Sequence, residues 1–144
     1  MSQPRRVISI DGGGYLGLAT AAFLHAVELR FSKHAASQFD LFCGTSTGAI
    51  IALALAADKT ASEIVALYEK LGPNVFKPKP ARNGAVGKVR DFFEHRSRAR
   101  HDNAALRAAL HETFGALTLG DLRSAGKRVL ITAFSVSEGS PRIF

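Results

Sequence analysis

The stretch FDLFCGTSTGAIIALALAA, residues 39–57, decides the fold. Its first five residues form a short, mostly apolar run that predicts a buried strand over residues 39–43. Residues 47–57 are apolar on nearly every side, which predicts a buried helix. Ser46 stands at the turn between the two, inside the pentapeptide Gly44-Thr-Ser-Thr-Gly48.

The pattern G-x-S-x-G between a strand and a helix is typical of a nucleophile elbow, a tight turn that lifts a serine hydroxyl clear of the sheet. Side chains at the flanking positions would collide in such a turn, which explains Gly44 and Gly48. The helix N-terminus also offers free amides and a positive dipole end, which favour an oxyanion. We predict that Ser46 is a nucleophile; the alternative is that it is only a structural turn residue.

A second glycine cluster, Asp11-Gly-Gly-Gly-Tyr-Leu-Gly17, follows a predicted strand over residues 6–10 and precedes a predicted helix. Amides without side chains in the way can hold a developing negative charge, which predicts an oxyanion loop. Its predicted donors are the amides of Gly12, Gly13, Gly14 and Thr47. We expect Asp11 to fix this loop by accepting its N–H groups. Close packing alone is one alternative. Dinucleotide binding is the other, although it expects an acidic residue ~20 residues further on, where residues 33–38 have none.

Working outward, helices alternate with strands. The sequence predicts a helix over 16–31, a helix from the Thr60–Glu63 capping box to Gly72-Pro73, and a long loop over 73–88. It then predicts a helix capped by Asp102 and closed by Gly115, a strand over 128–134, and a turn at 137–141 into a last strand. This alternation predicts one α/β domain over residues 1–144, with a mostly parallel sheet covered on both faces.

Composition excludes several classes of protein. The 144 residues are 47% hydrophobic and 22% charged, as in an ordinary globular domain. The single cysteine, Cys43, excludes an internal disulfide framework. The longest apolar run, residues 49–57, is far shorter than the ~20 residues that span a bilayer, and no secretory signal precedes the glycines. We expect a soluble, cytoplasmic protein that needs no cofactor and no metal.

Six of the seven net positive charges lie in residues 77–101, which hold eight Lys or Arg against two acidic residues. Such a segment favours phosphates, so peripheral contact with an anionic membrane surface is one interpretation. The adjacent Phe92 and Phe93 suit a membrane interface or stacking on nucleic-acid bases, and the sequence does not choose between the two. A solvated connection is the other interpretation. We expect no nucleic-acid role, since only this stretch would support one.

Together the two glycine motifs resemble the patatin-like phospholipase family. The matching residues are Asp11-Gly-Gly-Gly-x-x-Gly17-Leu18 and Gly44-Thr-Ser-Thr-Gly48, with further similarity at 39–42, 49–56, 68–76 and 128–134. The resemblance implies a three-layer α/β/α sandwich and a serine lipid acyl hydrolase that uses a Ser–Asp dyad without histidine. Ser46 carries over as the nucleophile, and Gly12, Gly13 and Gly14 as the oxyanion loop.

This sequence departs from the family pattern at two places. Leu16 stands where the family's glycine loop usually has a basic residue. The family's aspartate lies in a downstream Asp-Gly-Gly or Asp-Gly-Ala tripeptide, whereas the only Asp-Gly here is Asp11-Gly12. We therefore expect an N-terminal portion of the fold with little turnover by itself. Asp91 followed by His95 or His101 has the order of a Ser-His-Asp site, but no strand end positions them.

Three functions stay open at this point. The first is a phospholipase A or lysophospholipase that acts on lipid esters. The second is a serine esterase or thioesterase with a soluble acyl substrate, and the third is a non-catalytic binding fragment. Tyr15, Leu16 and Leu18 could line an acyl channel, although core positions are the favoured interpretation.

Overall fold

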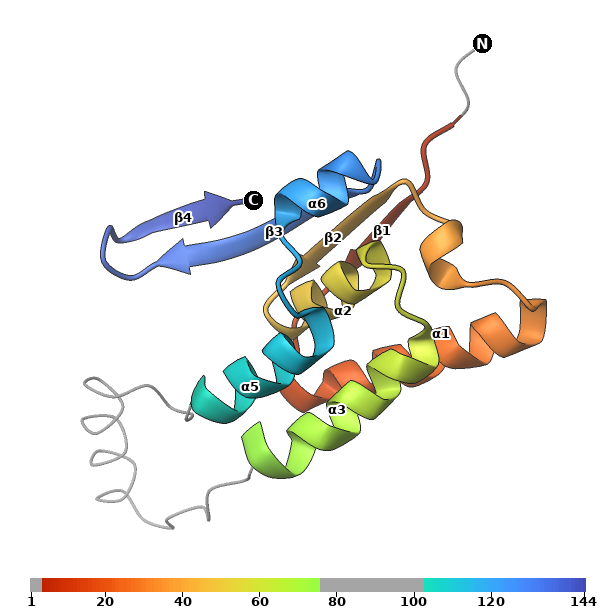
Figure 1. The fold of residues 1–144 in the computed structure, drawn as a ribbon, viewed down its shortest axis with the longest axis horizontal. Coiled ribbons are helices and arrows are strands. Elements are labelled where there is room, and N and C mark those ends of the chain that lie inside the picture. Colours follow the sequence, from red (N-terminus) through yellow and green to blue (C-terminus); the bar gives the residue numbers. More distant parts are fainter. Residues whose placement is uncertain (1–3, 76–102) are drawn as a thin grey trace, which may run out of the picture.

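The computed structural model describes residues 4–75 and 103–144, which form a four-stranded sheet with helices packed on it (Figure 1). The sheet order is β1 (Val7–Ile10), β2 (Leu41–Thr45), β3 (Arg128–Ser135) and β4 (Ser140–Ile143). The first three strands are parallel, and β4 returns antiparallel to β3. The predicted α/β class with a mostly parallel sheet is confirmed.

The predicted strand over 39–43 lies two residues further along the chain. The Arg6 amide donates to the Asp40 carboxylate at 2.8 Å, and the Asp40 amide donates to the Arg6 carbonyl at 2.8 Å. Asp40 is thus bonded to Arg6 just before the strand begins. Regular pairing of β1 with β2 therefore starts at the next residue, Leu41, opposite Val7.

Besides the sheet, the described residues form five α-helices. They are α1 (Gly17–Phe31), α2 (Thr47–Ala56), α3 (Ala61–Val75), α5 (Asn103–Phe114) and α6 (Leu119–Ser124). Two short 3-10 turns, η1 (Gly14–Leu16) and η2 (Ala35–Ser37), flank α1. The expected Asp102 cap and residues 76–88 of the expected loop lie outside the described residues.

The core lies between the sheet and α2. The largest fully buried side chains are those of Phe42, Ile51, Leu55, Ile64, Leu71 and Tyr68. Along the strands, alternate side chains point into this core, as Ile10 and Phe42 do, because successive residues of a strand face opposite sides. Val7, Leu130 and Phe134, on the opposite face of the sheet, are 52%, 38% and 63% exposed. The described helices therefore cover one of the two faces that we expected to be covered.

Helix α3 does not stop at Gly72-Pro73, as predicted, but continues to Val75. Its start is confirmed, since the Glu63 amide donates to the Thr60 hydroxyl and the Thr60 amide to the Glu63 carboxylate. These Thr60 contacts also lower the pKa of Glu63. The last turn persists because Leu71 and Val75 are buried against Ala109 of α5, so packing outweighs the intrinsic cost of proline.

Helix α6 was missed by the sequence analysis although its start carries a signal. The Asp121 amide donates to the Thr118 hydroxyl at 3.2 Å, and the Thr118 amide donates to the Asp121 carboxylate at 2.8 Å. Hydrogen bonds from the Thr118 hydroxyl and amide lower the pKa of Asp121. Leu122, which is buried, anchors this short helix to the core. The spacing Thr118-x-x-Asp121 could have predicted it.

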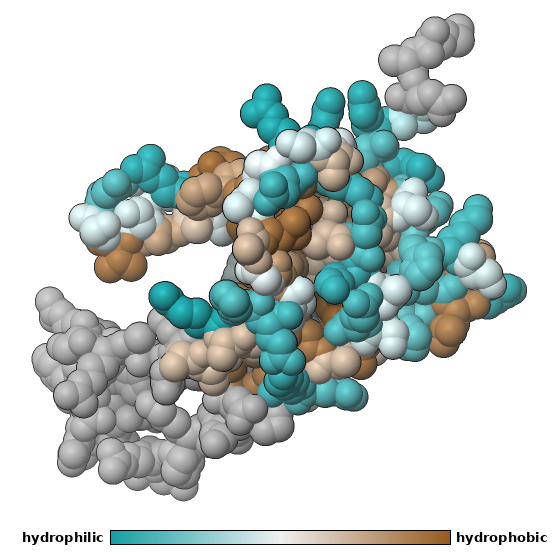
Figure 2. Space-filling view, in the orientation of Figure 1, coloured by the Kyte–Doolittle hydropathy of each residue, from teal (hydrophilic) through white to brown (hydrophobic). Residues whose placement is uncertain are grey.

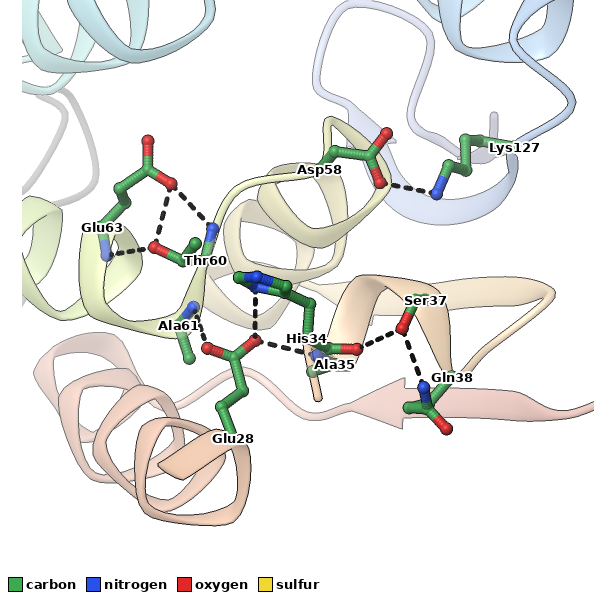
Figure 3. Close-up of polar contacts among 10 residues, drawn as sticks. All are labelled: Glu28, His34, Ala35, Ser37, Gln38, Asp58, Thr60, Ala61, Glu63 and Lys127. Atoms are coloured by element: carbon green, nitrogen blue, oxygen red, sulfur yellow. Dashed lines mark hydrogen bonds and ion pairs between the residues drawn. The ribbon is translucent and has the colours of Figure 1, made fainter. Parts of the chain in front are cut away.

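One carboxylate joins three elements at the end of α1 (Figure 3). Glu28 accepts the Ala35 amide of η2 at 2.8 Å and the Ala61 amide at the start of α3 at 2.9 Å. Its side chain is 10% exposed. Because a helix start leaves amides without intrahelical partners, Glu28 supplies an acceptor that α3 needs and fixes α1 beside it.

Candidate active site

Ser46 lies at the turn between β2 and α2, in a strained backbone conformation with φ 52° and ψ −126°. A non-glycine residue with positive φ is uncommon and costs free energy. The residue is exposed, and its side chain makes no capping hydrogen bond to α2. The alternative that Ser46 is only a structural turn residue therefore has no side-chain capping hydrogen bond to support it.

The glycines on either side of Ser46 are required by close backbone contacts. A Cβ atom at Gly44 would lie 2.5 Å from the Gly48 carbonyl oxygen and 2.7 Å from the Ala49 backbone. A Cβ atom at Gly48 would lie 2.2 Å from the Ile10 carbonyl oxygen and 2.6 Å from that of Asp11. The second contact presses the start of α2 directly onto the end of β1.

The glycine loop lies against the serine. A Cβ atom at Gly12 would be 2.7 Å from the Ser46 Cβ, so only glycine fits there without a shift. Gly14 has a φ of 59°, in the left-handed region. The parallel register Ile10↔Gly44 brings the two motifs together, since the carboxyl ends of β1 and β2 meet at the same edge of the sheet.

Thr47 has a second role beside the one predicted for its amide. Its hydroxyl accepts the Gly13 amide at 3.2 Å, which fixes the glycine loop to the start of α2. The Gly13 amide is therefore already engaged. The expectation that Asp11 fixes the loop is wrong. Among the described residues, the Asp11 carboxylate accepts no amide of the loop. The Thr47 hydroxyl accepts one instead.

Tyr68 supports the site from α3, and its position was not predicted. Its side chain is fully buried, and its hydroxyl donates to the Thr47 carbonyl at 2.6 Å. A Cβ atom at Gly17 would lie 2.4 Å from the Tyr68 ring, so the start of α1 rests on this tyrosine. The signal was a tyrosine on the apolar face of a helix, because a buried phenol needs a partner for its hydroxyl.

We expect Tyr68→Phe to lower the free energy of unfolding by ~1 kcal/mol at neutral pH, because the buried hydrogen bond to Thr47 is lost. Burial raises the pKa of Tyr68 from 10.0 to about 12, so the fold disfavours the ionised phenol. The stability that the fold gains from the neutral Tyr68 phenol is complete below pH 10 and is lost as the pH rises toward 12. Urea unfolding across this range should show a steeper alkaline loss in the parent chain than in Tyr68→Phe. Equal slopes would contradict the assignment.

The sequence is similar to those of known proteins. The sequence model of the patatin-like phospholipase family matches residues 8–143. The chain belongs to this family. It is 39% identical over 138 residues to the "cGAMP-activated phospholipase" of Pseudomonas aeruginosa. The aligned region covers 96% of this chain and 38% of that protein.

More distant relatives share the same region. "Patatin-like protein 2" of rice (Oryza sativa subsp. indica) is 30% identical over 153 residues, covering 96% of this chain and 36% of the rice protein. Human "Calcium-independent phospholipase A2-gamma" is 37% identical over 91 residues, covering 62% of this chain and 11% of that protein. The chain thus spans less than two-fifths of the length of these patatin-like relatives.

No acidic side chain of the described residues is placed as a partner of Ser46. Asp40 accepts the Arg6 amide, Asp58 accepts Lys127 at 2.7 Å, and Asp121 caps α6. Asp91, Asp102, His95 and His101 lie outside the described residues. Over residues 4–75 and 103–144, no three His, Cys, Asp or Glu side chains are grouped as metal ligands. None of the described helices is long and apolar enough to cross a bilayer.

Of the three residues for which the sequence analysis favoured core positions, Leu18 packs against the core as expected, whereas Tyr15 and Leu16 do not. Leu16, where patatin-like proteins usually carry a cation, is 75% exposed, and Tyr15 is 42% exposed. The Tyr15 ring also approaches α3, since a Cβ atom at Gly72 would lie 2.6 Å from it. The segment that follows the glycine loop therefore presents an apolar side chain, that of Leu16, to solvent.

Proposed function

We propose that Ser46 is the nucleophile of a lipid acyl hydrolase of the phospholipase A or lysophospholipase type. The observation that carries the proposal is a strained, exposed serine lying against a loop of bare glycine amides. Strain of this kind persists where surrounding structure enforces it and is common at reactive sites. Membership of the patatin-like family supports an ester of a lipid as the substrate.

In the proposed reaction, the Ser46 Oγ attacks the ester carbonyl and its proton passes to a carboxylate base. The amides of Gly12, Gly14 and Thr47 donate to the oxyanion that forms. The Gly13 amide, which donates to Thr47, positions the loop and is a donor to the oxyanion only if that bond opens. The alcohol portion leaves with a proton, and water then releases the fatty acid from the acyl-serine.

The base is the part of the mechanism that this sequence does not provide in a recognisable motif. The family resemblance implies an aspartate in an Asp-Gly-Gly or Asp-Gly-Ala tripeptide, and Asp11-Gly12 already forms the loop. We therefore expect the 144-residue chain to hydrolyse esters slowly or not at all. Rapid hydrolysis that depends on Ser46 would show that a base lies within these residues.

The nucleophile is testable without turnover. We expect an alkyl fluorophosphonate to modify Ser46 ahead of all other serines, because the oxyanion amides still stabilise the tetrahedral adduct. Peptide mapping by mass spectrometry locates the adduct. Faster labelling by a long-chain probe than by a short-chain one indicates a lipid hydrolase, whereas equal rates indicate a soluble-ester hydrolase. Labelling no faster than that of surface serines would contradict the proposal.

A further inference from the structure

Helix α1 exposes an unusual apolar face. The side chains of this face, which we call the α1 ridge, recur at helical spacing and are all exposed: Ala19, Ala22, Phe23, Ala26 and Leu29. Phe23 and Leu29 are 68% and 69% exposed, and Phe31 beside them is 65% exposed. Figure 2 shows hydrophobic residues over the C-terminal part of α1, at the right of the view, with hydrophilic residues around them.

The ridge points away from the rest of the molecule. Gly17, Ala21 and Leu24, the buried residues of α1, lie on the opposite side of the helix. That side packs on α3 and α2. The ridge therefore contributes nothing to the core of the described residues, and exposing large apolar side chains side by side is unfavourable unless something covers them.

The exposed charged side chains that α1 itself places beside the ridge have one sign. Residues 16–33 contain a single acidic residue, Glu28, and it is turned inward onto the amides of Ala35 and Ala61. Arg30 and Lys33 are exposed at the C-terminal end. The Arg30 guanidinium lies 5.7 Å from the centre of the Phe31 ring, so a cation and an aromatic ring sit together at this end.

The ridge is continuous with the candidate active site. Leu16 immediately precedes α1 and is 75% exposed, and a Cβ atom at Gly13 would lie 3.3 Å from the Leu16 Cβ. The apolar surface thus begins at the glycine loop and runs along α1 to the cations. A surface that covers the ridge would also meet Leu16 at the end of the glycine loop.

We propose that the α1 ridge docks the protein on an anionic lipid surface. The inference rests on the proposed function, for which substrate would enter from that surface. Leucine and aromatic side chains flanked by Lys and Arg are the composition that binds at a membrane interface. Two copies of the ridge packed on each other would bring the cations of α1 together with no exposed acid of α1 to pair them, whereas anionic headgroups supply the missing charge.

The test is flotation with vesicles of three parts phosphatidylcholine to one part phosphatidylglycerol, using the Ser46→Ala chain so that no lipid is hydrolysed. We expect Phe23→Ser/Leu29→Ser to reduce the partition coefficient about tenfold, because two apolar side chains no longer enter the interface. The matched control is Val136→Ser, which removes a side chain that is 89% exposed in the β3–β4 turn. Both variants keep every Lys and Arg, and circular dichroism checks the fold.

Vesicle binding by the double variant equal to that of the Val136→Ser control would overturn the proposal. So would sedimentation showing a dimer that the double variant dissociates, since the ridge would then cover a second copy. This flotation test can fail independently of the Ser46 labelling test of the proposed function. Ridge-dependent flotation with an unreactive Ser46 would refute only the hydrolase, and Ser46 labelling with ridge-independent flotation would refute only the docking.

Discussion

Replacing Ser46 with glycine removes the fluorophosphonate adduct and raises the melting temperature. The adduct is lost because the hydroxyl is the reacting group. The fold gains because glycine adopts a φ of 52° without the strain that a Cβ atom imposes. Strain of this kind is worth ~1–3 kcal/mol, and the extra freedom of glycine in the unfolded chain offsets part of it. We expect a net gain of ~1 kcal/mol, or about 3 °C.

The matched control is Ser46→Ala, which removes the same hydroxyl but keeps the Cβ atom and therefore the strain. Its adduct should also be lost, while its melting temperature stays close to that of the parent chain. Thermal unfolding by circular dichroism and intact-mass analysis measure the two effects separately. A lower melting temperature for Ser46→Gly than for Ser46→Ala would show that the turn is not strained in the way the backbone angles indicate.

Gly48→Ala should prevent the chain from folding stably. The added methyl group would lie 2.2 Å from the Ile10 carbonyl oxygen and 2.8 Å from the Asp11 carbonyl carbon, and both are backbone atoms that cannot rotate away. Relief requires α2 to move off β1, which opens the core around Phe42 and Ile51. We expect a loss of more than ~3 kcal/mol, a large fraction of the stability of a domain this size.

Gly120→Ala provides the comparison, since it also replaces a helical glycine. Its nearest contact would be the Thr118 hydroxyl at 3.4 Å, and α6 should gain slightly from alanine's helix propensity. Urea unfolding of the parent chain, Gly48→Ala and Gly120→Ala measures the three free energies of unfolding. If Gly48→Ala unfolds at the same urea concentration as Gly120→Ala, the contact between α2 and β1 is looser than described. The tight turn at Ser46 that depends on this contact would then also be looser.

Much of the local structure could be predicted because it depends on neighbours in the chain. The β-prone run before Gly44 and the apolar run after Gly48 define a strand, a tight turn and a buried helix, since each forms from nearby residues. The Thr60–Glu63 capping box likewise marks the start of α3. The Thr118–Asp121 pair carried the same information and was overlooked.

Other features depend on contacts between distant residues, which no local pattern contains. The end of α3 is set by burial of Leu71 and Val75 against α5, and proline alone predicted it wrongly. The support that Tyr68 gives to Thr47 needs α3 to lie beneath α2 and α1. The exposure of Leu16 and of the α1 ridge also follows only from which face of α1 packs on α3.

The sequence by itself determined the residue types that can make an elbow and an oxyanion loop, because tight turns and bare amides demand glycine at fixed spacing. Only the tertiary structure decided that Gly12 touches Ser46 and that Thr47, not Asp11, holds the loop. The physical reason is the parallel register of β1 and β2. Pairing Ile10 with Gly44 brings together two segments 34 residues apart, and that pairing depends on how the whole sheet packs.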